Sequence, residues 1–226
     1  MDIDKIQKKV ASGFNKAANI AGFSVIQIRP QNSSMPTSSD KISILRCLID
    51  PSPSFSGLSP IIWGHKILFC AIDTENVKIG DYLEVQEDLN ICNISIDIYF
   101  VARFEPWKPL LIVQTNKSIS FYESDVSSDN NLVGLRPPSG PVWKNDIQIA
   151  SNYRVSMLEI SASGRSPTGL GTDLSVGNWE ILMPRIPDVT LSQGLRIKDM
   201  DQNCYHILTV EETQFGLRLI VKSDQA

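Results

Sequence analysis

After residue 22 the apolar side chains of the chain recur with a period of two, in short runs separated by polar loops. The stretch 201–222, DQNCYHILTVEETQFGLRLIVK, shows this pattern most clearly. A period of two places apolar side chains on one face of a β-strand, whereas a helix repeats every three or four residues. Several positions on the second face are apolar too, which indicates that parts of this stretch are covered on both sides. We therefore expect 201–222 to form a closing hairpin of a barrel or sandwich, with ETQFG as its turn.

Other short runs along the chain are dominated by Ile, Val, Leu, Phe and Tyr, which suit a half-buried pleated surface. Strands this short and this closely spaced favour a mainly β fold with two small antiparallel β-barrel or sandwich-like domains. The segment 109–123, PLLIVQTNKSISFYE, is expected to be a hairpin that turns near Thr115-Asn116-Lys117. The other expected strands are FSVIQIRP, ISILRCLI, IIWGHKILFCAID, VKIGDYLEVQ, ISIDIYFVARF, VWKNDIQIA, YRVSMLEISA, WEILMPRI and GLRIKDM.

An N-terminal amphipathic helix precedes the β segments in this prediction. Residues 2–21 repeat apolar side chains at three- and four-residue steps, and Gly22 can end the helix. Such a helix packs on its own domain or docks, as an arm, on a neighbouring subunit. The stretch 124–141 is rich in Pro, Gly, Ser, Asp and Asn and is the best candidate linker. The expected organisation is a helix (1–22), a first β domain (23–124), a linker (125–141) and a second, barrel-like β domain (142–226).

Composition narrows the classes of function. The chain has 226 residues, 42% of them apolar and 20% charged, which is ordinary for a protein with a real core. Its net charge of −4 argues against general binding to a phosphate backbone, which needs clustered Lys and Arg. No apolar run approaches the roughly 18–20 residues that span a bilayer, so we do not expect a membrane as a partner. Because of the net charge, we do not expect a sequence-specific nucleic acid as a partner either.

The sequence contains few residue patterns that are typical of a catalytic or metal site. Four cysteines form no CxxC pair, and two histidines, His65 and His206, have no spacing typical of metal ligands. GRSPTGLG lacks the Gly-Lys-Ser/Thr ending of a phosphate loop, and no Gly-x-Ser-x-Gly elbow is present. We expect no enzyme activity, no cofactor and no metal. Glycosidase carboxylates can lie far apart in sequence, so a carbohydrate-binding or carbohydrate-active β domain stays an alternative.

Three short segments carry a resemblance to a family. They are Gly80-Asp81-Tyr82-Leu83, then Phe100-Val101-Ala102 with Pro109 and Asn116, and Phe215-Gly216-Leu217-Arg218-Leu219. In this order, after an N-terminal helix ending in GFNKAANIAG, the chain resembles a family of uncharacterised structural proteins of tailed bacteriophages and prophages. It departs from that family at Lys117, where Arg is usual, and at Gly216-Leu217, which replaces Gly-Trp.

The C-terminal half, through LRIKDMDQNCYHIL, is similar to head–tail joining (neck or stopper) proteins of tailed phages. This similarity implies a small β-barrel that assembles as a ring around a DNA channel, between portal or adaptor and tail proteins. The resulting expectation is a non-enzymatic virion protein, made in the cytoplasm of the infected bacterium and working as a head–tail connector. A tail, baseplate or capsid-decoration protein is the alternative within this class.

Ring subunits meet through surfaces, so the expected site is a set of contacts. We expect strand edges, the loops 31–60 and 161–178, and the N-terminal helix to touch neighbouring subunits. Exposed tryptophans can anchor a protein or a sugar ring. The candidate contact residues are Ile6, Val10, Phe14, Trp107, Trp143, Arg165 and Leu170.

Overall fold

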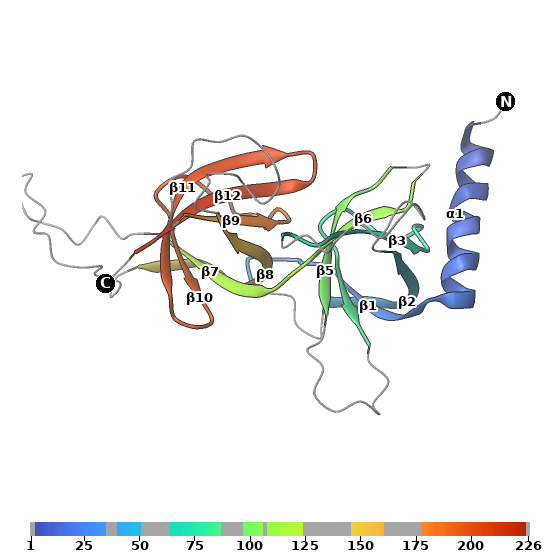
Figure 1. Cartoon of the computed structure of the whole chain (residues 1–226), viewed down its shortest axis with the longest axis horizontal. Coiled ribbons are helices and arrows are strands. Elements are labelled where there is room, and N and C mark those ends of the chain that lie inside the picture. The colour runs from blue at the N-terminus through green and yellow to red at the C-terminus, as the bar shows by residue number, and fades with distance from the viewer. Residues whose placement is uncertain are drawn as a thin grey trace, which may run out of the picture.

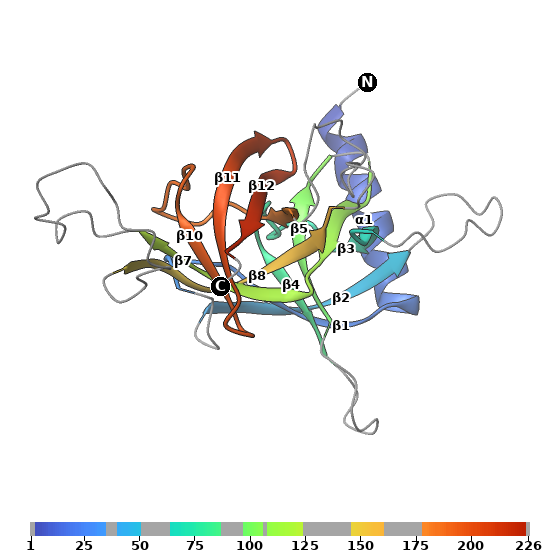
Figure 2. The ribbon, with the colours of Figure 1, turned by 60° about the vertical axis from the view of Figure 1, so that its left-hand side comes forward.

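A computed structural model shows a mainly β protein with one helix and two closed six-stranded antiparallel barrels (Figure 1). The structure describes residues 3–34, 40–50, 64–86, 97–105, 108–123, 146–160 and 178–224. The expected fold class is therefore confirmed. The two barrels lie side by side along the long axis, and the helix stands at one end (Figures 1 and 2).

The first barrel has the strand order β1-β2-β3-β6-β5-β4 and closes through pairing of β1 with β4. Its interior holds apolar side chains from every strand, among them Val25, Ile72, Leu83, Val101 and Ile112. Alternate residues of the same strands point outwards, as the period of two predicts. The strands are β1 (Phe23–Ile28), β2 (Lys41–Asp50), β3 (Ile67–Ile72), β4 (Tyr82–Val85), β5 (Ile98–Arg103) and β6 (Leu110–Gln114).

The second barrel has the order β10-β11-β12-β9-β8-β7 and closes through pairing of β10 with β7. Its interior is lined by side chains such as Phe121, Tyr153, Ile181, Ile197 and Leu219. The expected C-terminal hairpin is present as the antiparallel pair of β11 and β12. The strands are β7 (Lys117–Glu123), β8 (Ile147–Glu159), β9 (Asn178–Met183), β10 (Arg196–Asp199), β11 (Cys204–Thr213) and β12 (Gly216–Ser223).

The expected hairpin over 109–123 is wrong. β6 pairs with β3 and β5 of the first barrel, whereas β7 pairs with β8 and β10 of the second. Both edges of each strand are thus occupied, and Thr115-Asn116 is a link between barrels rather than a turn. The barrel boundary accordingly falls at this link and not at 124. The candidate linker 125–141 lies outside the described residues, and it connects two strands of the same barrel, β7 and β8.

The helix α1 (Ile3–Ala21) packs on β2 and β3 of its own chain. Its C-terminus lies so close to β2 that a Cβ at Gly22 would come within 2.3 Å of the carbonyl oxygen of Cys47. Glycine therefore lets the helix end and β1 begin without a gap, as the amide of Gly22 bonds the carbonyl of Ala18 at 2.8 Å. Of the two positions expected for this helix, packing on its own domain is the one that the structure contains.

Because both sheets close, the strands of the described barrels are paired on both sides. Contacts that we expected at strand edges would therefore have to come from strand faces, loops or α1. Among the described residues, no helix combines the length and the apolar character needed to cross a membrane.

Candidate functional site at the seam between the barrels

The outer face of the first barrel packs against the second through apolar side chains. Ile26, Tyr82, Phe100 and Val113 are at most 7% exposed and form one cluster, against which Leu182 of β9 packs. These residues belong to the outward-pointing set of their strands, so only a second layer of protein can bury them. The cluster, which we call the seam, joins the barrels into one body.

The side-chain amide of Asn116 fixes the link between the barrels, because it bonds the backbone of β8 as a neighbouring strand would. Its side-chain nitrogen donates to the carbonyl of Met157 at 2.8 Å, and its side-chain oxygen accepts the amide of Met157 at 2.8 Å. Its own amide donates to the carbonyl of Val155 at 2.9 Å. Across the seam, the Tyr82 hydroxyl donates to the carbonyl of Arg154 at 2.9 Å. The two barrels are therefore held by directional bonds as well as by apolar packing.

A buried polar cluster lies beside the apolar seam. His65, in the segment that leads into β3, crosses to the second barrel, where its Nδ1 lies 2.7 Å from Oγ of Ser156 on β8. Its Nε2 lies 3.5 Å from Oε2 of Glu180 on β9. Glu180 also accepts the Nε–H of Arg218 on β12, and Nη1 of Arg218 donates to Glu211 at 2.6 Å.

Burial is nearly complete at the centre of this cluster. The side chains of His65, Glu180 and Arg218 are 1%, 0% and 2% exposed. Burial lowers the pKa of Arg218, but its hydrogen bonds to Glu180 and Glu211 outweigh this effect and leave the pKa raised. The guanidinium therefore stays charged, and the carboxylate of Glu180 serves as its counter-ion.

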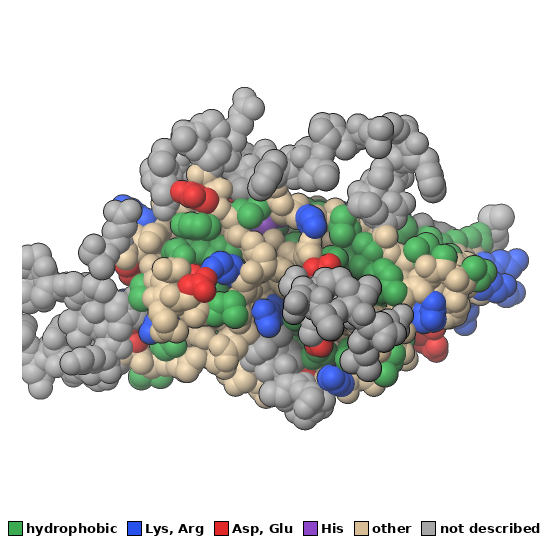
Figure 3. Space-filling view, turned by 60° about the horizontal axis from the view of Figure 1, so that its bottom comes forward, with side chains coloured by type: hydrophobic (Ala, Val, Ile, Leu, Met, Phe, Trp, Pro, Cys, Tyr) green, Lys and Arg blue, Asp and Glu red, His purple; other side chains and the backbone are tan. Residues whose placement is uncertain are grey.

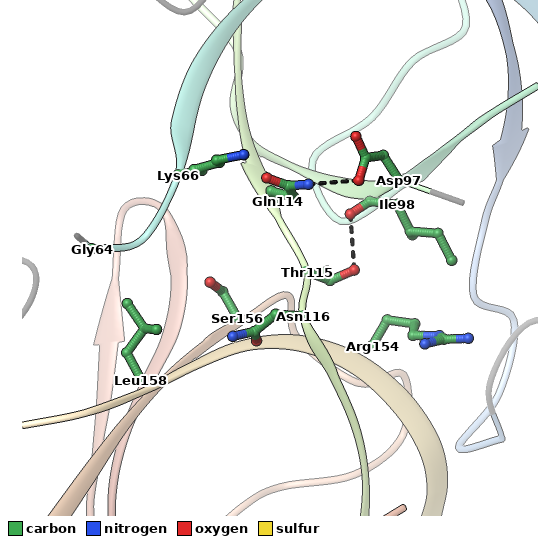
Figure 4. Close-up of a pocket in the computed structure, with 10 residues that line it drawn as sticks. All are labelled: Gly64, Lys66, Asp97, Ile98, Gln114, Thr115, Asn116, Arg154, Ser156 and Leu158. Carbon is green, nitrogen blue, oxygen red and sulfur yellow. Dashed lines mark hydrogen bonds between the residues drawn. The ribbon is translucent and has the colours of Figure 1, made fainter. Parts of the chain in front are cut away.

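A cavity of about 430 Å³ opens next to the cluster, between the barrels (Figure 4). Lys66, Asp97 and Gln114 line it from the first barrel, and Arg154, Ser156 and Leu158 line it from the second. Its volume falls within the range of small-molecule sites. A serine, a histidine and a carboxylate beside a cavity also raise the question of a hydrolytic triad.

The geometry favours a structural role over such a triad. Ser156 lies in the middle of β8, where it pairs with Leu182 in the sheet ladder. Two neighbouring amide groups that could stabilise an oxyanion are already used, because Asn116 and the amide of Met157 bond each other and Gln114 donates to Asp97 at 2.7 Å. Glu180 is paired with Arg218 rather than dedicated to the imidazole. The cluster therefore locks the barrels together.

The Gly80-Asp81-Tyr82-Leu83 motif proves to be part of the fold's framework. Asp81 is 1% exposed and accepts hydrogen bonds from Gln27 at 2.7 Å and from Arg29 at 2.7 Å. The hydrogen bond to Asp81 raises the pKa of the Arg29 guanidinium. Tyr82 points into the seam, whereas Leu83 points into the first barrel. Tyr82 thus serves the joint and Leu83 the core, while Asp81 anchors a buried group of hydrogen bonds.

The Phe215-Gly216-Leu217-Arg218-Leu219 motif lies at the same joint. The guanidinium carbon of Arg103 lies 5.4 Å from the centre of the Phe215 ring, which brings the end of β5 against the β11–β12 turn. Gly216 has a φ of 117°, and a Cβ there would lie 2.6 Å from the carbonyl oxygen of Met183. Arg218 supplies the buried ion pair. The segments that carry the resemblance thus place Tyr82, Asn116 and Phe215 at the contact between barrels.

The predicted contact residues divide into two groups. Ile6, Val10 and Phe14 lie half-buried along α1, and Phe14 lines a small groove beside the first barrel. Their contact with another subunit stays a prediction. Four further predicted residues lie outside the described part of the chain, namely Trp107, Trp143, Arg165 and Leu170.

The cysteines that the structure describes are free thiols, and Cys47 and Cys70 are buried in the first barrel. A hydrogen bond to Cys47, together with burial, raises the pKa of Cys70. Among the described residues, no group of three His, Cys, Asp or Glu side chains could hold a metal ion.

Comparisons with protein-family models, curated proteins and solved structures found no match to this chain.

Proposed function

We propose that this chain is a non-enzymatic structural protein of a tailed-phage particle, made in the bacterial cytoplasm. Within the particle, it acts as a head–tail connector, or neck, component that assembles as a ring. Its partners are further copies of itself and the portal or adaptor and tail proteins on either side. The contacts between copies are heterologous, since a ring closes by rotation when one face of a subunit meets a different face of the next.

The observation that carries the proposal is the location of the motif residues. The segments that resemble phage structural proteins provide Tyr82, Asn116 and Phe215 to the contact between barrels. A shared motif that builds a joint, rather than a reactive centre, supports a protein whose work is to hold a shape. The result is an elongated body with two different ends, as a subunit of a ring requires (Figure 1).

Self-assembly of the purified chain tests the proposal. Mass photometry and sedimentation velocity, from about 0.1 to 100 µM, are expected to show a closed oligomer that forms with rising concentration. Electron micrographs of the same sample are expected to show rings. A chain that stays monomeric over this whole range would contradict assembly through its own surfaces.

A further inference from the structure

The outward face of α1 carries a row of lysines. Lys5, Lys8, Lys9 and Lys16 are all exposed, whereas Ala18 on the opposite face is fully buried. At about 3.6 residues per turn, the four lysines fall within one side of the helix, which we call the lysine face. Figure 3 shows Lys and Arg side chains gathered at the end of the molecule that carries α1. Charge is therefore unevenly distributed: the net charge is −4, but the end of the molecule with α1 is cationic.

Three of the lysines on this face have no charged partner among the described residues. Lys8, Lys9 and Lys16 make no ion pair within the described residues. The nearby carboxylate of Glu105 is already paired, with Arg103 at 2.5 Å and with Lys108 at 2.7 Å. Lys8, Lys9 and Lys16 are thus a source of positive charge that the described part of the chain does not neutralise.

A groove of about 200 Å³ borders the lysine face where α1 meets the first barrel. Ala11 and Phe14 line it from the helix, and Phe104, which is 41% exposed, lines it from the end of β5. Lys8 belongs both to the groove and to the lysine face. Together, the groove and the lysine face offer an apolar slot next to a cationic row. This combination fits a segment with apolar side chains and carboxylates.

The opposite end of the molecule supplies such a segment. β7 ends at Glu123, which is exposed, and β8 begins at Ile147, both at the end of the second barrel away from α1 (Figure 1). The sequence of residues 123–135 is ESDVSSDNNLVGL, with three carboxylates, no cation, and the apolar residues Val126, Leu132, Val133 and Leu135. Residues beyond Glu123 in this segment lie outside the described part of the chain.

We propose that the lysine face and its groove bind the acidic segment 123–135 of a second copy of this chain. The inference rests on the proposed function, because a contact between opposite ends of two copies is the heterologous contact that a ring requires. A membrane surface fits less well, since the apolar side of α1 is packed on β2 and β3 and the helix would have to detach to insert.

Charge reversal tests the contact in the full chain. The variant Lys8→Glu/Lys9→Glu/Lys16→Glu is expected to weaken self-association about tenfold or more, because three favourable pairs become repulsive. Adding Asp125→Lys and Asp129→Lys to the same chain is expected to restore most of the loss. The matched control, Lys41→Glu/Lys78→Glu/Lys222→Glu, changes the net charge equally at exposed lysines elsewhere and is expected to leave association unchanged.

A peptide of residues 123–135 separates this inference from the proposed function. Its binding to the full chain, followed by fluorescence anisotropy, is expected to be lost with the triple lysine variant and kept with the control. Oligomers that form equally well without the three lysines would overturn the inference and leave the proposed function intact. A monomeric chain would overturn self-assembly, and failure of the peptide to bind it would overturn the inference as well. Tighter binding of a DNA duplex than of the peptide would assign the lysine face to a nucleic acid instead.

Discussion

Removing one partner of the buried ion pair beside the seam is expected to lower the free energy of unfolding substantially. In Glu180→Leu, the guanidinium of Arg218 stays 2% exposed but loses the carboxylate on its Nε side. Among the described contacts it keeps Glu211, whose side chain is 40% exposed. Losing one member of a buried pair costs about 3–5 kcal/mol of unfolding free energy, and the surviving contact places this variant near the lower limit, at about 3 kcal/mol.

Removing both charges is expected to cost far less. Nε2 of His65 and Nη2 of Arg218 make no hydrogen bond within the described structure, so the polar cluster is only partly satisfied. The double variant Glu180→Leu/Arg218→Leu eliminates the buried charge and is expected to lie within about 1 kcal/mol of the parent chain. The two changes are therefore coupled by about 2 kcal/mol or more.

Urea unfolding followed by far-UV circular dichroism measures these differences, compared at an unchanged slope. The control is Glu212→Leu, which breaks the exposed pair of Glu212 with Arg185, 2.5 Å apart with side chains 61% and 67% exposed. This variant is expected to lose at most about 0.5 kcal/mol. A Glu180→Leu chain as stable as this control, or a double variant as unstable as the single one, would refute the reasoning.

Two further predictions concern two tyrosines in the interior of the second barrel and the serine of the polar cluster. Burial raises the pKa of Tyr153 and Tyr205 to about 12, above the ordinary value of about 10. The unfolded chain therefore releases these protons first, so the free energy of unfolding is full below about pH 10 and falls as the pH rises towards about 12. Urea unfolding at several alkaline pH values, with tyrosinate absorbance as the titration signal, checks this, and a stability that stays flat would contradict it. Ser156→Ala leaves Nδ1 of His65 without its partner and is expected to lose about 1–2 kcal/mol, while a fluorophosphonate probe is expected to label neither chain. Labelling of the parent chain that disappears in the variant would show an activated serine and contradict the non-enzymatic role.

Much of the local structure was predictable because it depends on neighbours in sequence. The three- and four-residue repeat in α1 indicates one apolar stripe, and Gly22 marks the end of the helix. The period of two over 201–222 reports strands with one or two covered faces, and its turn lies at the expected place. The β class follows from the same signal, since a side chain's face is set by its position along the strand.

Strand partners were not predictable from this pattern. The sequence near Thr115-Asn116 suits a hairpin as well as a link, because alternation states which face is apolar and not which strand lies alongside. β6 and β7 separate because each finds two partners in its own barrel. The candidate linker 125–141 was assigned on composition, which does not reveal whether a polar stretch joins two barrels or two strands of one.

The sequence by itself determined the helix, the β class and the short segments on which the resemblance rests. Only the tertiary structure decided what those segments do. His65 and Ser156 are 91 residues apart along the chain, and their neighbours contain no pattern typical of a shared site. They meet because two closed barrels bury their outer faces against each other, and the free energy of that burial depends on long-range packing that no local pattern encodes.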